Sequence, residues 1–116
     1  MSDQAAANRL ILAVERYGET TVLHCTGRLV AGVTNQLQVE VSQLIPGSKL
    51  VVLDCKELTR IDSTGIGTLV RLYVHAKSAG CSFELFNMGK SVRQLLGVTH
   101  LLSVLESVGK HHIKMG

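Results

Sequence analysis

Residues 53–67 read LDCKELTRIDSTGIG, and this stretch decides how the rest of the sequence is interpreted. It begins at the end of an unbroken apolar run, residues 50–53, which is typical of a strand buried on both faces of a parallel sheet. After it, apolar residues recur with helical spacing as far as residue 74. The stretch therefore predicts a strand that ends, turns, and places Asp62 and Ser63 at the N-terminus of a helix.

The predicted helix begins near Ser63 and ends before Gly80. Its inward stripe is predicted to consist of Ile66, Leu69, Val70, Tyr73 and Val74. The side chains predicted to lie mostly outward are Thr68, Arg71, His75 and Ser78. Gly65 and Gly67 fall in the first turn, where each glycine costs about 1 kcal/mol relative to alanine. We interpret their missing side chains as leaving backbone open for close approach by another molecule.

The hydroxyl of Ser63 has two interpretations at this stage. Asp and Ser are both favoured N-cap residues, so Ser63 could serve only to satisfy free backbone N–H groups. Alternatively it is a phosphoacceptor, because a phosphate adds about −1.5 to −2 charges at pH 7 and a helix N-terminus tolerates negative charge well. The spacing alone leaves both open.

The flanking segments alternate between strand-like and helix-like patterns. Residues 10–15 and 22–26 predict two strands joined by a turn at residues 17–20, and therefore a hairpin. Residues 34–45 predict a helix that Thr34 caps and that Pro46-Gly47 ends. Further predicted elements are a strand at residues 81–86, a helix opened by a capping box at residues 91–94 and running toward His100, and a short strand at residues 104–105.

The predicted fold class is α/β, with a mixed, mostly parallel sheet of four to five strands that starts with a hairpin and has helices packed against it. With 116 residues, of which 46% are hydrophobic and 18% charged, the sequence fits one globular domain. We expect that domain at residues 9–108, between a flexible N-terminal segment at residues 1–8 and a polar C-terminal tail at residues 109–116.

Composition argues against several classes of function. The net charge of +3 is spread along the sequence without a run of lysines or arginines, and aromatic residues are few, so direct nucleic-acid binding is not expected. No apolar run approaches the ~20 residues that a membrane span needs, and residues 1–8 do not resemble a signal peptide. We therefore expect a cytoplasmic protein. Cys25, Cys55 and Cys81 form no C-x-x-C pair and are interpreted as reduced, structural residues.

Residues 53–67 resemble the signature of the STAS family, named for sulfate transporters and anti-sigma factor antagonists. Bacterial stand-alone members carry a sequence close to L-(D/N)-x-x-x-L-x-x-(I/M)-D-S-(S/T)-G-(L/I)-G. Every defined position is met here, from Leu53 and Asp54 through Leu58 and Ile61 to residues 62–67. The resemblance in strand order extends over about residues 10–106.

The resemblance implies an anti-sigma factor antagonist, a non-enzymatic regulator in a partner-switching pathway. The unphosphorylated form would bind an anti-sigma factor that is also a serine kinase, phosphorylation would release it, and a phosphatase would reset it. Ser63 would be the phosphoacceptor, with Thr64 as a weaker alternative. The implied partner-binding residues are Asp62, Ser63, Thr64, Gly65, Ile66 and Gly67.

The chain departs from the family pattern in several respects, among them a net charge of +3 where antagonists are expected to be acidic, and two alternative functions stay open. Many antagonists have Gly-x-Leu-Asp after the second strand, whereas Val30 replaces that carboxylate here, and the final helix of the family is not evident in residues 109–116. One alternative is a STAS scaffold or an accessory subunit of a signalling or transport complex. The weaker alternative is a nucleotide or small-ligand sensor that uses the Gly-rich helix start.

Neither a cofactor nor a metal ion is expected from the remaining motifs. The segment beginning at Gly65 has Val70 where a dinucleotide fingerprint needs its third glycine. Residues 89–91 imitate the end of a phosphate-binding loop, but Glu84 occupies the position of its first glycine. No catalytic triad, acid–base pair or set of histidine ligands is apparent, so the sequence does not indicate an enzyme.

Overall fold

The computed structural model describes residues 9–90 and 92–94. Within these residues, four strands form one sheet in the order β1-β2-β3-β4. They are β1 (Leu10–Tyr17), β2 (Thr20–Leu29), β3 (Leu50–Ile61) and β4 (Ser82–Phe86). Strand β1 is antiparallel to β2, whereas β2, β3 and β4 are parallel to one another. The predicted α/β fold with a mixed, mostly parallel sheet is therefore confirmed.

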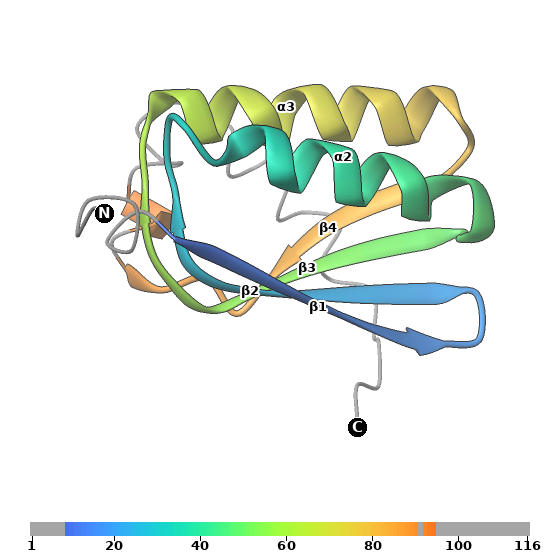
Figure 1. Ribbon diagram of the computed structural model, residues 1–116. Helices are drawn as coiled ribbons and strands as arrows, with labels where there is room; N and C mark the ends of the chain where they lie inside the picture. Colours follow the sequence, from blue (N-terminus) through green and yellow to red (C-terminus); the bar gives the residue numbers. More distant parts are fainter. Residues whose placement is uncertain (1–8, 91, 95–116) are drawn as a thin grey trace.

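Helices α2 (Thr34–Leu44) and α3 (Ser63–Ser78) lie side by side on one face of the sheet (Figure 1). Between them and the sheet lies a hydrophobic core that is mostly aliphatic. The sheet contributes Leu23, Leu53 and Phe83, all at most 1% exposed, and the helices contribute Leu37 and Leu69. This layer fixes where the turn between β3 and α3 emerges.

The initial hairpin is longer than the sequence predicted. Its turn uses Gly18 with a φ of 66°, a left-handed conformation that glycine adopts without strain. The strands then pair without interruption from Tyr17 opposite Thr20 to Leu10 opposite Gly27. The alternation of apolar and polar residues predicted shorter strands, because polar residues at the strand ends also take part in the backbone pairing.

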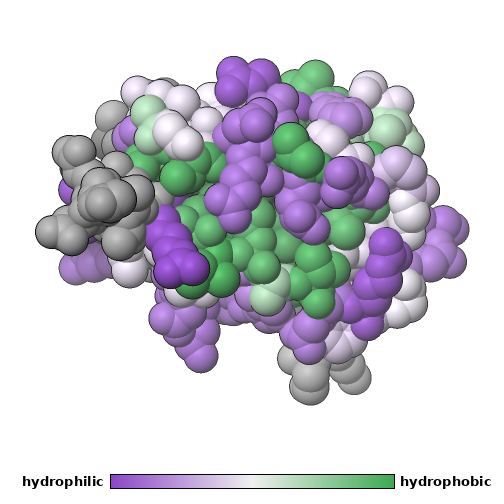
Figure 2. All heavy atoms as spheres, in the orientation of Figure 1, coloured by the Kyte–Doolittle hydropathy of each residue, from purple (hydrophilic) through white to green (hydrophobic). Residues whose placement is uncertain are grey.

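Strand β1 forms one edge of the sheet. On the side of the molecule shown in Figure 2, apolar residues form a band between α2 and the hairpin. Ile11 and Val14 of β1 are 49% and 41% exposed.

Helix α2 begins where predicted, but its first turn is not capped by Thr34 as predicted. Thr34 is the first helical residue and not the cap; the N-cap position is Val33, and no side chain there caps the helix. The chain enters the helix through a turn in which the N–H of Val33 donates to the carbonyl of Val30 over 3.1 Å. At the other end, Pro46 lies in a 3₁₀ turn, Ile45–Gly47, which ends the helix as predicted.

The buried face of α3 is rotated relative to the predicted stripe. Ile66 and Leu69 are buried as predicted, but Leu72 is also buried and Val74 is 59% exposed. Thr68, predicted to face outward, is fully buried because its hydroxyl donates to the carbonyl of Thr64 over 3.0 Å. A hydroxyl satisfied within its own helix can turn inward without an unpaired polar group.

After β4, Lys90 and residues 92–94 are helical, and the N–H of Arg93 donates to the carbonyl of Gly89 over 2.9 Å. The start of the predicted third helix is thus confirmed. The capping box at Ser91, the helix toward His100, the strand at residues 104–105 and the segments 1–8 and 109–116 lie outside the described residues.

The cysteines are free and buried, in agreement with the structural role predicted for them. Burial raises the pKa of the Cys25 thiol to about 12 and also raises the pKa of the Cys55 thiol.

None of the helices in the described part is both long and apolar enough to cross a membrane.

Candidate functional site

The turn between β3 and α3 lies at the carboxyl end of the sheet. The parallel strands β2 and β3 finish together there, with Leu29 opposite Ile61. The next backbone N–H, that of Asp62, donates to the carbonyl of Leu29 over 3.3 Å. Ser63 then begins α3. Binding sites in open α/β sheets lie at this end of the strands, so the position is favourable for a functional site.

Asp62 is the residue that organises this turn. It is the N-cap of α3, and its Oδ1 accepts a hydrogen bond from the N–H of Gly65 over 2.9 Å. Its Oδ2 accepts another from the N–H of Ala31, also over 2.9 Å, which ties the loop before α2 to the helix. Burial alone would raise the pKa of Asp62, but these backbone donors outweigh it and hold the pKa below its ordinary value. The carboxylate is therefore ionised.

Ser63 is exposed, and in the described part of the chain no hydrogen bond engages its hydroxyl. Asp62 already caps the helix, so the interpretation of Ser63 as only a capping residue is wrong. Thr64, the alternative acceptor, is also exposed. Both hydroxyls are therefore accessible to another protein.

The two glycines of the first turn have different roles. A Cβ atom at Gly65 would lie 2.3 Å from the carbonyl oxygen of Leu29 and 2.8 Å from the side chain of Ile61. Gly65 is thus needed for close packing of α3 on its own strands, which corrects the interpretation that it leaves backbone open to another molecule. At Gly67 the nearest atom would be 3.8 Å away, on the flexible side chain of Arg71.

The six predicted partner-binding residues therefore separate into two groups. Gly65 and Ile66 are buried, and Ile66 belongs to the core at 7% exposure. Ser63 and Thr64 are exposed, while Asp62 and Gly67 are partly exposed. A partner would contact this second group directly, and the buried pair can act only by holding it in place.

The sequence did not identify the backbone groups that complete the turn, the carbonyl of Leu29 and the N–H of Ala31. No side-chain pattern marks such groups. Val30, which replaces the carboxylate common in antagonists, is 8% exposed and contributes an apolar side chain.

No group of three or more His, Cys, Asp or Glu side chains that could hold a metal ion occurs among residues 9–90 and 92–94. One cavity lies near the far end of α3 and is lined by Tyr73, Lys77, Gly80, Cys81, Ser82 and Phe83. The Gly-rich helix start, on which a ligand sensor would depend, is not part of its lining.

The sequence that folds into this sheet and turn also matches the model of a known protein family. The model of the STAS domain matches residues 12–114. The chain belongs to the STAS family. The exposed turn at Asp62 and Ser63 is thus the β3–α3 turn of a STAS domain.

Several solved structures share this STAS fold. The anti-sigma factor antagonist SpoIIAA in its unphosphorylated form is 20% identical, with a TM-score of 0.69 over 78% of this chain and 82% of that chain. An anti-sigma factor antagonist from Mycobacterium paratuberculosis is 16% identical, with a TM-score of 0.76 over 84% of each chain. A sulfate transporter family protein from Wolinella succinogenes is 17% identical, with a TM-score of 0.68 over 77% of this chain and 73% of that chain.

A second polar cluster links three strands of this STAS domain. His24 of β2 lies between two carboxylates: its Nε2 contacts Oε1 of Glu15, and its Nδ1 lies 2.8 Å from Oδ2 of Asp54. The hydrogen bond to Glu15 raises the pKa of His24 against the opposing effect of burial. Burial would raise the pKa of Asp54, but hydrogen bonds from Asn87, from the N–H of Lys56 and from His24 lower it overall.

These shifts predict a stability contribution that depends on pH. A raised pKa means that His24 contributes fully below its ordinary pKa of 6.5, and that the contribution is lost as pH rises through the folded value. Asp54 contributes above its ordinary 3.8 and loses that contribution as pH falls through its lowered value. The cluster is therefore most effective between these two ordinary values.

Substitution His24→Gln tests this contribution through the free energy of unfolding. We expect the free energy of unfolding of wild type to exceed that of the variant by less than about 1 kcal/mol, because His24 and Glu15 are partly exposed. This difference should shrink as the pH rises from about 6 to about 9. Urea denaturation across that range gives the measurement, and the exposed His75 provides the control His75→Gln. A difference that grows with pH would contradict the assignment.

Proposed function

We propose that this STAS domain is an anti-sigma factor antagonist that acts in the cytoplasm through partner switching. In its unphosphorylated form it binds an anti-sigma factor that is also a serine kinase. Phosphorylation of Ser63 releases it, and a phosphatase restores the binding form. The observation that carries the proposal is the Ser63 hydroxyl, which is exposed beside the capping carboxylate of Asp62 and forms no hydrogen bond with the described residues.

The geometry suits a residue that is modified and restored repeatedly. Because Asp62 supplies the cap, adding a phosphoryl group to Ser63 breaks no hydrogen bond of the described fold. The N-terminal end of the α3 dipole favours negative charge, which limits the effect of the phosphate on stability. The modification should therefore change the surface and leave the fold intact.

Two of the similar structures support this proposal. One is named as an anti-sigma factor antagonist from Mycobacterium paratuberculosis. The Bacillus cell fate determinant SpoIIAA has been solved in a phosphorylated form, which is 19% identical to this chain with a TM-score of 0.64. A second candidate function, accessory subunit of a transport complex, has its support in the likeness to the Wolinella sulfate transporter family protein.

Intact mass spectrometry after co-expression with candidate anti-sigma factor kinases tests the proposal. We expect wild type to gain one phosphate and Ser63→Ala to gain none, because only Ser63 combines exposure with the position directly after the cap. Thr64→Ala is the matched control and should be phosphorylated like wild type. Phosphorylation that persists in Ser63→Ala and disappears in Thr64→Ala would move the acceptor to Thr64.

Stable complexes with transport or scaffold subunits, without phosphorylation by any kinase, would instead favour the accessory-subunit function. The same co-expression experiment reports both outcomes if the co-purified proteins are identified.

A further inference from the structure

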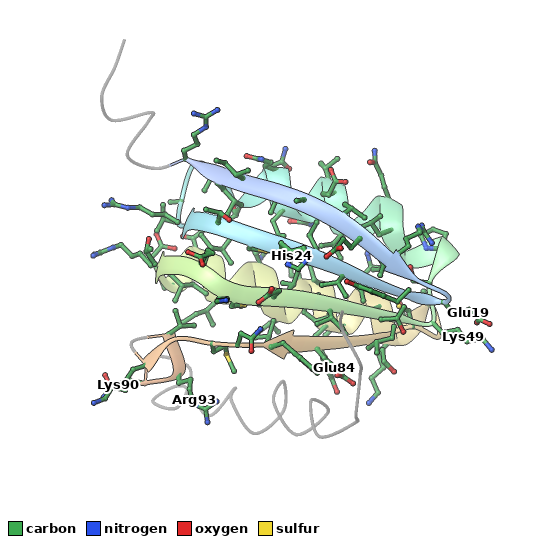
Figure 3. The ribbon with its side chains drawn as sticks, turned by 90° about the horizontal axis from the view of Figure 1, so that it is seen from below. Glu19, His24, Lys49, Glu84, Lys90 and Arg93 are labelled. Atoms are coloured by element: carbon green, nitrogen blue, oxygen red, sulfur yellow. The ribbon has the colours of Figure 1, made fainter. Side chains whose placement is uncertain are left out.

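Four basic residues from four different segments lie at the same end of the sheet, where β2 and β3 finish. Arg28 of β2 and Arg60 of β3 are direct Cα partners in the parallel pair. The N–H of Arg28 donates to the carbonyl of Arg9, which places Arg9 beside them at the start of β1. Figure 3 shows Lys90 at this same end of the sheet. We call Arg9, Arg28, Arg60 and Lys90 the basic rim.

The three arginines of the basic rim project from the same face. Each one directly precedes a buried core residue in its segment: Leu10, Leu29 and Ile61, respectively. Successive side chains of a strand point to opposite faces, so the arginines point away from the face that α2 and α3 cover. In Figure 3, which views the molecule from the side opposite α2 and α3, nitrogen-tipped side chains extend from this end of the sheet.

The basic rim is not neutralised within the described part of the chain. None of its four residues forms an ion pair there, and Arg28 opposite Arg60 is a like-charge pair, which disfavours strand pairing. At the opposite end of the sheet, by contrast, Lys49 pairs with Glu19 over 3.3 Å (Figure 3). The fold thus retains a repulsive arrangement at one end without an internal partner for it.

Two acidic residues lie near the basic rim, and neither compensates it. Glu57 lies opposite Thr26, two pairs away from Arg28 and Arg60 in the ladder, and forms no ion pair with described residues. Asp62 uses both carboxylate oxygens to accept backbone N–H groups. Val30 adds no charge where many antagonists have a carboxylate. The end of the sheet therefore presents a positive surface next to Ser63.

We propose that the basic rim is the docking surface for an acidic segment of the protein that binds at Ser63. Arginine forks bind carboxylates with two parallel hydrogen bonds, so neighbouring arginines on adjacent strands suit a segment with several Asp or Glu side chains. Arg60 precedes Ser63 by three residues, so one partner can cover both. This inference rests on the proposed function for the identity of the partner, not for the chemistry of the surface.

Charge reversal at the centre of the rim tests the inference. The variant is Arg28→Glu with Arg60→Glu, and the matched control is Arg16→Glu with Lys77→Glu, which changes the net charge equally. Arg16 bonds to Gly47 and Lys77 lies in the last turn of α3, both away from the rim. Isothermal titration with the kinase identified above should show about a tenfold or larger loss of affinity for the rim variant and a weaker salt dependence.

A second probe separates this inference from the proposed function. Fluorescence anisotropy of a labelled polyglutamate peptide at low salt should show tighter binding to wild type and to the control than to the rim variant. If no kinase binds or modifies the chain but the peptide still discriminates, the proposed function fails and the docking surface stands. If Ser63 is phosphorylated while the rim variant and the control bind kinase and peptide alike, the docking surface is overturned.

The variants should be compared by circular dichroism before binding is measured. Should the double reversal fail to fold, Arg28→Gln with Arg60→Gln takes its place, because it removes the charge and retains a long polar side chain. The same order of affinities is expected, and equal affinities would again overturn the docking surface.

Discussion

Phosphorylation of Ser63 is expected to weaken binding of the anti-sigma factor kinase by about 100-fold or more. The phosphoryl group adds about −1.5 to −2 charges at pH 7 directly beside the ionised carboxylate of Asp62. Burying that charge in an interface requires its desolvation, and an acidic partner segment on the basic rim would also be repelled by it. Charged groups left unpaired in an interface lose about 2 to 5 kcal/mol, and each 1.4 kcal/mol is tenfold in affinity.

Titration calorimetry with the chain before and after enzymatic phosphorylation measures this effect. Ser63→Ala keeps the neutral surface and should bind the kinase as tightly as the unphosphorylated wild type. Thr64→Ala should lose affinity on phosphorylation just as wild type does. Equal affinity of the phosphorylated and unphosphorylated wild type would show that the modification does not control binding.

Circular dichroism of the phosphorylated chain supplies the structural control. The fold should be unchanged, because Asp62 and not Ser63 satisfies the first N–H groups of α3. A loss of helical signal on phosphorylation would mean that affinity falls through local unfolding. The far-ultraviolet spectrum therefore distinguishes charge repulsion in an unchanged fold from local unfolding of the helix.

The sequence predicted the fold well because its periodic patterns coincide with the buried faces. The unbroken apolar run at residues 50–53 becomes the first part of β3, whose Val51, Val52 and Leu53 are at most 1% exposed. The glycine at position 18 and the proline at position 46 mark a turn and a helix end because their backbone preferences act locally. Elements governed by such local chemistry can be located before any tertiary contact is known.

Features that depend on contacts between distant segments were not predicted. Thr68 was predicted to lie on the outward side of the apolar stripe, but the buried face is rotated, and the bond of its hydroxyl to the carbonyl of Thr64 allows it to be buried. The basic rim was missed because Arg9, Arg28 and Arg60 are far apart in the sequence and only strand pairing brings them together. A search for runs of basic residues cannot find a cluster of this kind.

The sequence also could not decide whether Asp62 or Ser63 caps α3. The pattern Asp-Ser before a helix leaves open which residue is the cap, since both are favoured there. The structure assigns the cap to Asp62, because its two oxygens reach the N–H groups of Gly65 and Ala31 at once. The second of these groups belongs to another loop, so no local pattern could reveal it.

Gly65→Ala is expected to destabilise the fold by about 2 to 4 kcal/mol, which would lower the melting temperature by about 10 to 20 °C. The added methyl group would lie 2.3 Å from the carbonyl oxygen of Leu29. That atom belongs to the backbone of β2, a strand held on both sides by β1 and β3, so it cannot move as a side chain would. It also accepts the N–H of Asp62, so relief of the clash would displace the cap and Ser63 with it.

Gly67→Ala is the matched control two positions along the same turn. Its methyl group would meet only the flexible Arg71 side chain at 3.8 Å, and alanine favours helix by up to about 1 kcal/mol over glycine. Urea denaturation of the two variants should therefore give opposite signs, with Gly65→Ala less stable and Gly67→Ala equal to or more stable than wild type. If both variants were equally stable, the close packing of α3 on β2 would not be what requires a glycine at position 65. If Gly67→Ala is stable but binds the kinase more weakly, the partly exposed backbone at Gly67 is part of the partner contact, because binding is then lost without a loss of stability.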